Sequence, residues 1–252
     1  MERKQFKKQG IDIITNASVE TVDTKGSGVK AKIKTQTSET IIEADILLSA
    51  VGVMANIENI GLETLGIKTE KGKIVVDKYG QTTISGIYAI GDCTPGQSLA
   101  HVASKEGIVA AEAIAFNDKK ISHQPEPLDY NNIPGCTYCS PEIASVGLTE
   151  KAAKEAGHEI KVGKFPFMAS GKASAAGATE GFVKVIFDAK YGEFLGCHMI
   201  GMNVTEMIAE VVTARKLETT AHEILTAVHP HPTMSEGLKE ATAAAYGEAI
   251  DI

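Results

Sequence analysis

The first part of the chain alternates apolar and polar residues in short runs that are separated by turns. Val29–Thr35 alternates with a period of two, and Ile11–Thr15 and Ser18–Val22 are shorter runs of the same type. A turn with two glycines, Lys25–Gly28, lies between the second and third runs. Alternation with this period is typical of strands that bury one face. The pattern therefore predicts a β-meander.

A different pattern follows the meander. Ala44–Gly52 is a nearly continuous apolar run that ends in glycine, which is typical of a strand buried on both faces of an α/β sheet. Lys73–Asp77 and Ile87–Ile90 are also expected to be strands. Ser98–Phe116 has helical spacing, many alanines and few helix breakers. The pattern of this region predicts an α/β fold.

A polar, proline-bearing stretch, Ser122–Asn132, divides the chain and is typical of a connection between domains. Beyond it we expect a strand, a helix, two paired strands and a long helix, with two more helices at the end. The expected segments are, in that order, a strand through Thr137–Cys139, a helix over Thr149–Ala156, strands Gly181–Asp188 and Glu193–Gly201, and a helix through Glu206. Strands and helices that are segregated in this way predict an α+β domain with a mostly antiparallel sheet.

Composition narrows the class of protein. A chain of 252 residues with 43% apolar and 23% charged residues can bury a sizeable core. The net charge of −7 comes from interspersed acidic and basic residues, so neither nucleic acid nor an anionic membrane is an expected partner. No apolar run reaches the roughly 20 residues that span a bilayer, and the first residues lead into no signal-peptide region. Four scattered cysteines also favour a reducing compartment, so a soluble intracellular protein is expected.

The segment Thr82–Asp92 carries the first candidate chemistry, because an expected strand runs into Gly91-Asp92 just before a helix. A glycine lets a ligand approach the backbone, and the aspartate can accept hydrogen bonds from sugar-like hydroxyls. The helix N-terminus adds unpaired N–H groups and a partial positive charge. The alternative is that Asp92 only caps the helix.

The second candidate is the segment Ala227-Val-His-Pro-His-Pro-Thr-Met-Ser-Glu. Imidazole is well matched to proton transfer near neutral pH when a carboxylate supports it, and His231 and Glu236 supply these two groups. Two alternatives remain. Glu236 could accept from the Thr233 N–H in a capping box, and His229 with His231 could form half of a metal site. No further His or Cys cluster accompanies the two histidines, so no metal is expected.

The wider context of both segments resembles a known family. The histidine segment, followed by a helix that ends Ala-Ala-Tyr-Gly, is similar to the C-terminal sequence of dihydrolipoamide dehydrogenases in the pyridine nucleotide-disulfide oxidoreductase family. Thr-x-x-x-Gly-Ile-Tyr-Ala-Ile-Gly-Asp resembles the second flavin-binding motif of that family. The likeness covers nearly the whole chain, including Pro141–Glu150, Gly181–Val185 and Leu195–Gly201. It implies an α/β part, made of the C-terminal remnant of an NAD-binding domain (1–52) and a central, FAD-binding segment (53–125), and an α+β dimerisation domain (126–252).

The resemblance also implies roles for residues. His231 would be the base that exchanges a proton with the dithiol substrate, and Glu236 would be its carboxylate partner. Asp92, next to Gly91, would hold the ribityl chain of the flavin. The backbone of Ser98, Leu99, Ala100 and His101 would approach the flavin ring. Gly52 and Val19 match family positions that touch NAD. The family usually continues Gly-Arg-x-Pro-Asn where this chain has Gly52-Val-Met-Ala-Asn, so the role of that arginine is not carried over.

For function, the resemblance implies FAD and NAD as cofactors and a homodimer in which His231 faces the flavin and disulfide of the other subunit. The implied partners are lipoyl domains of 2-oxo acid dehydrogenase or glycine cleavage complexes, in the bacterial cytoplasm or the mitochondrial matrix. The Gly-x-Gly-x-x-Gly motifs and the redox disulfide of the family are not in this sequence, so we expect the C-terminal half of an enzyme, inactive by itself. The alternatives are a reductase of glutathione or mercuric ion and a non-catalytic dimerisation module.

Cys136-Thr-Tyr-Cys139 has the spacing of thioredoxin-like redox sites. In an extended strand the two Cα atoms would be about 10 Å apart, beyond the roughly 7 Å that a disulfide tolerates. We therefore expect no redox pair here. Cys93 and Cys197 are expected to be packed side chains rather than nucleophiles.

Overall fold

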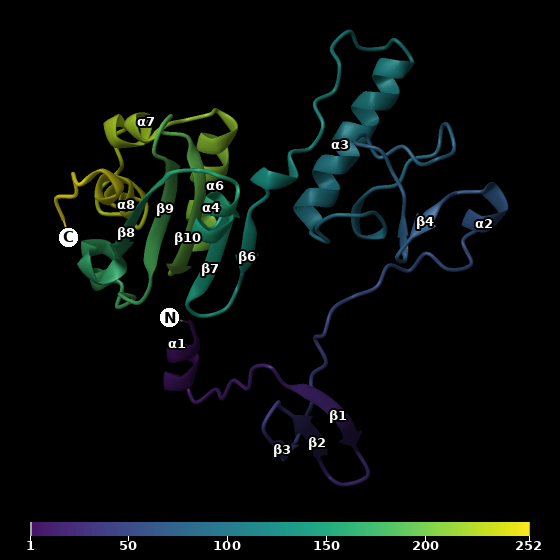
Figure 1. The fold of residues 1–252 in the computed structure, drawn as a ribbon, viewed down its shortest axis with the longest axis horizontal. Helices are drawn as coiled ribbons and strands as arrows, with labels where there is room; N and C mark the ends of the chain where they lie inside the picture. Colours follow the sequence, from purple (N-terminus) through teal and green to yellow (C-terminus); the bar gives the residue numbers. More distant parts are fainter. Residues whose placement is uncertain (1, 252) are drawn as a thin grey trace. The chain divides into compact units, whose positions relative to one another are not determined.

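The computed structural model describes the backbone of residues 2–251 and the side chains of residues 5–251. It divides into two compact units, residues 1–54 and residues 55–252. Figure 1 shows the course of the chain through both units. Each unit is described by itself.

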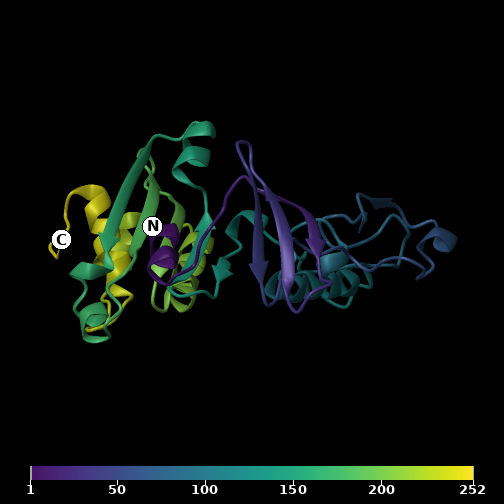
Figure 2. The same cartoon turned by 90° about the horizontal axis from the view of Figure 1, so that it is seen from below.

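The first unit contains a short helix, α1 (Glu2–Lys8), and a three-stranded antiparallel sheet. The strands β1 (Ser18–Asp23), β2 (Val29–Lys34) and β3 (Glu39–Ala44) pair in chain order, so the predicted meander is confirmed (Figure 2). Lysines of β2 pair with glutamates of both neighbouring strands, and such cross-strand ion pairs stabilise an exposed sheet face. The predicted strand at residues 11–15 is wrong, because this segment pairs with no strand and its isoleucines are exposed.

The apolar run from Ala44 to Gly52 does not form the buried strand that its pattern predicts. Only Ala44 belongs to a strand, the end of β3, and the rest of the run lies outside regular structure. Ile46, Leu48 and Val51 are 83%, 88% and 95% exposed. A strand buried on both faces needs partner strands and a covering layer. Within the described residues no strand pairs with residues 45–52, so the apolar side chains of this stretch stay uncovered.

The second unit begins with a small irregular region around one long helix. It comprises α2 (Leu62–Leu65), the two-residue strands β4 (Thr69–Glu70) and β5 (Lys73–Ile74), the 3₁₀ turn η1 (Gly91–Cys93) and α3 (Ala100–Asn117). The helix predicted over residues 98–116 is confirmed. Leu62, Ile67 and Ile74 form a small core with partly buried neighbours.

The strands predicted at residues 73–77 and 87–90 are mostly absent. Residues 73 and 74 pair with β4, whereas Val76 and Tyr88 make only isolated bridges. The Asp77 carboxylate accepts hydrogen bonds from the backbone N–H groups of Tyr79 and Gln81. A side chain that bonds nearby backbone in this way favours a tight turn over a continuous ladder. The local turn therefore limits the strand.

The rest of the second unit is built on a five-stranded sheet in which every pairing is antiparallel. Along the sheet the strands are β6 (Gly135–Thr137), β7 (Glu142–Gly147), β10 (Phe194–Gly201), β9 (Phe182–Asp188) and β8 (Ile160–Pro166). The predicted pairing of residues 181–188 with 193–201 is confirmed, and β7 and β8 are additional strands. The strand predicted through Cys139 ends at Thr137, before a bend.

Helices complete this domain and enclose its core (Figure 1, green to yellow). They are α4 (Glu150–Glu155), α5 (Gly171–Ala175), α6 (Val204–Lys216), α7 (Ala221–Thr226) and α8 (Glu236–Tyr246), with 3₁₀ turns η2 (Tyr130–Asn132) and η3 (Phe167–Ala169). The core joins strand residues such as Phe187 and Phe194 to helix residues such as Val211 and Leu238. The predicted α+β domain is confirmed. Between residues 2 and 251 there is no helix with the length and apolar character to cross a membrane.

Candidate functional site

His231 and Glu236 form a direct hydrogen-bonded pair. His231 lies in the loop between α7 and α8, and Glu236 is the first residue of α8. The Nδ1 atom of His231 is 2.8 Å from Oε1 of Glu236. The imidazole side chain is 77% exposed. The pair therefore presents an accessible ring whose tautomer and orientation are held by a carboxylate.

The second oxygen of Glu236 accepts a hydrogen bond from the backbone N–H of Thr233, at 2.8 Å. The hydroxyl of Thr233 donates to the Pro230 carbonyl, which further fixes the loop. Burial raises the pKa of the Glu236 carboxyl, but the hydrogen bonds from Thr233 and His231 outweigh it, so the pKa is lowered. The capping contact and the histidine contact, which the sequence offers as alternatives, are both present. Glu236 is therefore a charged group that can support an imidazolium.

His229 makes a separate pair with a residue that sequence analysis does not single out. Its Nε2 atom is 2.9 Å from Oε1 of Glu210 on α6, and its side chain is only 7% exposed. The hydrogen bond to Glu210 raises the pKa of His229 more than burial lowers it. Glu210 lies on α6, 19 residues from His229 in the sequence, so no local sequence pattern predicts that these two residues pair. Among the described residues no three His, Cys, Asp or Glu side chains gather as a metal site would require.

Gly91 and Asp92 form a tight turn, η1, rather than a helix start. Gly91 has a φ of 74°, in the left-handed region that favours glycine. The helix α3 begins only at Ala100, and its N-cap residue is Leu99. The alternative that Asp92 caps this helix is therefore wrong, because a loop of several residues intervenes. The Asp92 side chain is exposed.

The residues Ser98, Leu99, Ala100 and His101 lie at the start of α3. No side chain caps this N-terminus. The His101 ring bonds the Pro134 carbonyl at 3.1 Å instead. An uncapped N-terminus of an 18-residue helix offers backbone N–H groups and a partial positive charge. Together with the exposed Asp92 carboxylate, it supplies the donors and the acceptor that an anionic, hydroxyl-bearing cofactor requires.

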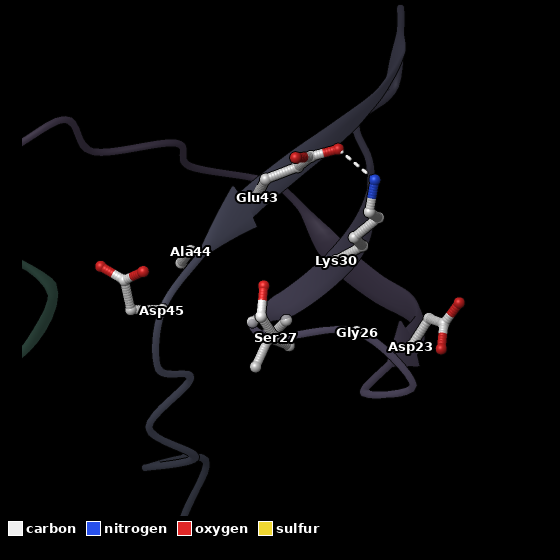
Figure 3. A pocket seen from close by; sticks show the side chains of 9 residues that line it. Asp23, Gly26, Ser27, Lys30, Glu43, Ala44 and Asp45 are labelled. Atoms are coloured by element: carbon white, nitrogen blue, oxygen red, sulfur yellow. Dashed lines mark hydrogen bonds and ion pairs between the residues drawn. The ribbon is translucent and has the colours of Figure 1, made fainter.

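The two residues expected near NAD belong to the first unit. Val19 lies on β1 and is 56% exposed. Gly52 has a φ of 121° and nothing within 4 Å of an added Cβ atom. Figure 3 shows a hollow in the same unit, between the turn that follows β1 and the end of β3. Lys30 and Glu43, which form an ion pair, are among its lining residues, and neither Val19 nor Gly52 lines it.

The four cysteines carry free thiols in the structure. Cys136 lies on β6, whereas Cys139 lies beyond the end of the strand and its thiol bonds the Pro141 carbonyl. Burial raises the pKa of the Cys136 thiol, and that of the fully buried Cys197 thiol is raised further by the same cause. A raised pKa keeps a thiol protonated and less reactive.

Comparison with known proteins accounts for most of the chain. Residues 133–242 match the family description "pyridine nucleotide-disulphide oxidoreductase, dimerisation domain", and residues 1–107 match "pyridine nucleotide-disulphide oxidoreductase". The chain belongs to this family. The first range contains His231 and Glu236, and the second contains Asp92, the start of α3, Gly52 and Val19. The resemblance and the fold class expected from the sequence are confirmed. A dimerisation domain supports formation of a homodimer.

Curated relatives of this chain are named dihydrolipoyl dehydrogenase. The protein from Rhizobium etli is 49% identical over 99% of this chain and 51% of its own length. The protein from Bacillus subtilis is 47% identical over 97% and 51%, and the mitochondrial protein of Pisum sativum is 40% identical over 99% and 50%. The chain therefore spans about half the length of the curated relatives it matches.

The chain also covers about half the length of the solved structures that it matches. LpdA from Mycobacterium tuberculosis matches with a TM-score of 0.85 and 25% identity, over 95% of this chain and 50% of the other. The flavoprotein disulfide reductase RclA from Escherichia coli matches with a TM-score of 0.83 and 27% identity, over 95% and 53%. The family is FAD-dependent and uses a pyridine nucleotide.

Proposed function

We propose that this chain is the C-terminal half of a dihydrolipoyl dehydrogenase, the half that carries the catalytic base. The overall reaction is dihydrolipoamide plus NAD⁺ to lipoamide, NADH and a proton. The observation that carries the proposal is the exposed His231 ring bonded to Glu236 at 2.8 Å, in a chain 49% identical to a dihydrolipoyl dehydrogenase. A histidine that acts as a base must reach its substrate with one ring nitrogen, while a neighbouring group fixes the position of the other ring nitrogen.

In this proposal His231 accepts a proton from a substrate thiol at Nε2, because Nδ1 is engaged by Glu236. Transfer of that proton leaves a thiolate, which is the nucleophilic form of sulfur in disulfide exchange. The Glu236 carboxylate stabilises the positive charge that the ring acquires. The hydrogen bond from Thr233 keeps this carboxylate ionised and in place.

The flavin contacts of the chain are assigned to the Gly91-Asp92 turn and the start of α3. Asp92 would accept hydrogen bonds from ribityl hydroxyls, and the backbone from Ser98 to His101 would lie near the ring. The uncapped helix N-terminus and the exposed carboxylate fit such a ligand. Bound FAD supplies the electron transfer between dithiol and NAD⁺. Gly52 and Val19 are assigned to NAD.

The proposal divides the chain at residues 52 and 125, and assigns the homodimer interface to residues 126–252. In the dimer His231 would lie opposite the flavin and disulfide of the other subunit, so the isolated chain would not complete the reaction. The substrates would be lipoyl domains of 2-oxo acid dehydrogenase or glycine cleavage complexes, in the bacterial cytoplasm or the mitochondrial matrix. The fold match to RclA favours, as a second candidate, a reductase of a different disulfide.

A chimera separates these candidates. This chain replaces the matched half of the Bacillus subtilis relative, and bound flavin is measured first to establish that the chimera has assembled. We expect NAD⁺ reduction that depends on dihydrolipoamide and is not supported by reduced glutathione. A flavin-loaded chimera that responds only to glutathione, or to neither thiol, would contradict the proposal.

A further inference from the structure

The backbone of the Gly91-Asp92 turn is held by Thr94 at the end of the turn and by two side chains of other elements, Glu106 and Lys73. The Gly91 N–H donates to Oε2 of Glu106 on α3, at 2.6 Å. The Gly91 carbonyl accepts from the backbone N–H and the hydroxyl of Thr94, at 2.9 and 2.8 Å. The Asp92 carbonyl accepts from the ammonium group of Lys73 on β5. The turn is therefore fixed while the Asp92 side chain is exposed.

Glu106 uses its other oxygen on a different part of the chain. Its Oε1 atom accepts a hydrogen bond of 2.5 Å from the hydroxyl of Tyr130 in η2. Burial, and then the bond to Glu106, raise the pKa of Tyr130 to about 12, so the phenol stays protonated and remains a donor. The same ring packs on the loop that follows the turn, because a Cβ atom at Gly96 would lie 3.1 Å from the Tyr130 ring. Tyr130 is thus linked to the turn through Glu106, and its ring packs on the loop that follows the turn.

The η2 segment is in turn fastened to the five-stranded domain. The guanidinium of Arg215 on α6 donates to the Asn131 carbonyl at 2.9 Å and to Oδ1 of Asn132 at 2.6 Å. It also donates to the Phe194 carbonyl on β10 at 3.0 Å. Asn132 donates to the carbonyl of Val212. A continuous chain of contacts therefore runs from the turn through Glu106 and Tyr130 to the core of this domain.

We infer that Glu106 and Tyr130 are positioning residues that couple the flavin-binding turn to the dimerisation domain. The Glu106 carboxylate accepts one hydrogen bond from Gly91 and one from Tyr130. If either bond is lost, the carboxylate is held in place only by the other. A coupling of this kind is reciprocal: order in η2 favours the turn that binds flavin, and bound flavin favours order in η2. The flavin part of the inference rests on the proposed role of Asp92.

Tyr130→Phe tests the coupling, because it removes the hydroxyl and keeps the ring on Gly96. Amide hydrogen exchange is measured on the full chain. We expect exchange at residues 91–94 to become about five- to tenfold faster, as for the net loss of one ordinary hydrogen bond, while the core of β10 is unchanged. Tyr79→Phe is the matched control, because the Tyr79 hydroxyl accepts from Gln124 and is not bonded to Glu106. Equal exchange at residues 91–94 in the Tyr130 variant and the unchanged chain would overturn the coupling.

Titration with FAD, followed by flavin fluorescence, tests the consequence for the cofactor. We expect Tyr130→Phe to weaken FAD binding by the same factor as it speeds exchange, and Glu106→Gln to weaken it further, because the amide carries no charge and the NH2 that replaces one carboxylate oxygen cannot accept from a donor. Unchanged affinity in both variants would overturn the link to flavin. Because this chain carries only part of the flavin site, the titration is made in the chimera with the Bacillus subtilis relative. If the chimera binds no FAD, the proposed flavin site fails, and hydrogen exchange alone then decides whether Glu106 and Tyr130 couple the turn to η2.

Discussion

The two histidines of the His-Pro-His segment, although two residues apart, lie in opposite environments. His229 is buried and bonds Glu210, whereas His231 is exposed and bonds Glu236. A base must reach its substrate, and only His231 can do so without a structural change. The buried pair of His229 with Glu210 ties the loop to α6. The His229 ring therefore anchors the loop, whereas the His231 ring is accessible to substrate.

Glu236→Gln tests the role of the carboxylate in the folded state. Because the pKa of Glu236 is lowered from its ordinary value of 4.5, ionisation stabilises the folded state above that value, and this stabilisation is lost as the pH falls through the folded-state pKa. We expect the variant to lower the free energy of unfolding by about 1 kcal/mol at about pH 7, and by less below about pH 4. Urea unfolding at both pH values measures this difference in the free energy of unfolding. Glu248→Gln, at an exposed site, should change neither; a pH-independent loss at Glu236 would contradict the account.

At residue scale the sequence predicted the candidate catalytic residues, but not the partners that lie far away in the chain. His231 and Glu236 are five residues apart, so their pairing could be predicted from a local pattern. Glu210 and Glu106 lie 19 and 15 residues from the groups they bind, His229 and Gly91, on helices whose orientation only the tertiary structure defines. The sequence also posed capping and histidine support as alternatives for Glu236, whereas two oxygens allow both.

At the scale of elements, α8 positions Glu236 and packs directly on β8. A Cβ atom at Gly163 on β8 would lie 1.8 Å from the Ala241 carbonyl and 2.6 Å from the Ala245 backbone nitrogen. Both contacts are to backbone, which cannot rotate away. Glycine is therefore required at this position for the helix to approach the strand.

Gly163→Ala should separate α8 from β8. We expect a loss of about 1–3 kcal/mol in the free energy of unfolding, as is usual when atoms are forced into a packed core. Gly171→Ala, where an added Cβ meets nothing within 4 Å, is the control and should leave the urea midpoint nearly unchanged. Equal midpoints for the Gly163 variant and the unchanged chain would show that α8 does not need this close approach.

Elements with a clear period were predicted well, and those that depend on distant partners were not. The paired strands β9 and β10 and the helix α3 follow from apolar patterns that the local chain satisfies. The apolar run through Leu48 has the composition of a buried strand, but composition does not supply neighbours, and the run is exposed. The strand predicted from Lys73 shortened because the Asp77 carboxylate favours a turn.

At the scale of the whole molecule, a domain that matches a dimerisation family occupies residues 133–242 and carries the histidine pair. We expect the purified chain to have twice its own mass in solution when measured by light scattering, because the interface is assigned to residues 126–252. A monomer at all accessible concentrations would show that this region alone does not form the dimer.

The central claim is that His231 is the base for dithiol oxidation, and the chimera with the Bacillus subtilis relative tests it most directly. A base acts on the thiol half of the reaction, whereas oxidation of NADH by an artificial dye requires only the two cofactors. We predict that His231→Gln lowers NAD⁺ reduction by dihydrolipoamide by about 10²- to 10⁴-fold, with the rate of dye reduction by NADH retained. Equal loss of both activities, or retention of both, would contradict the claim.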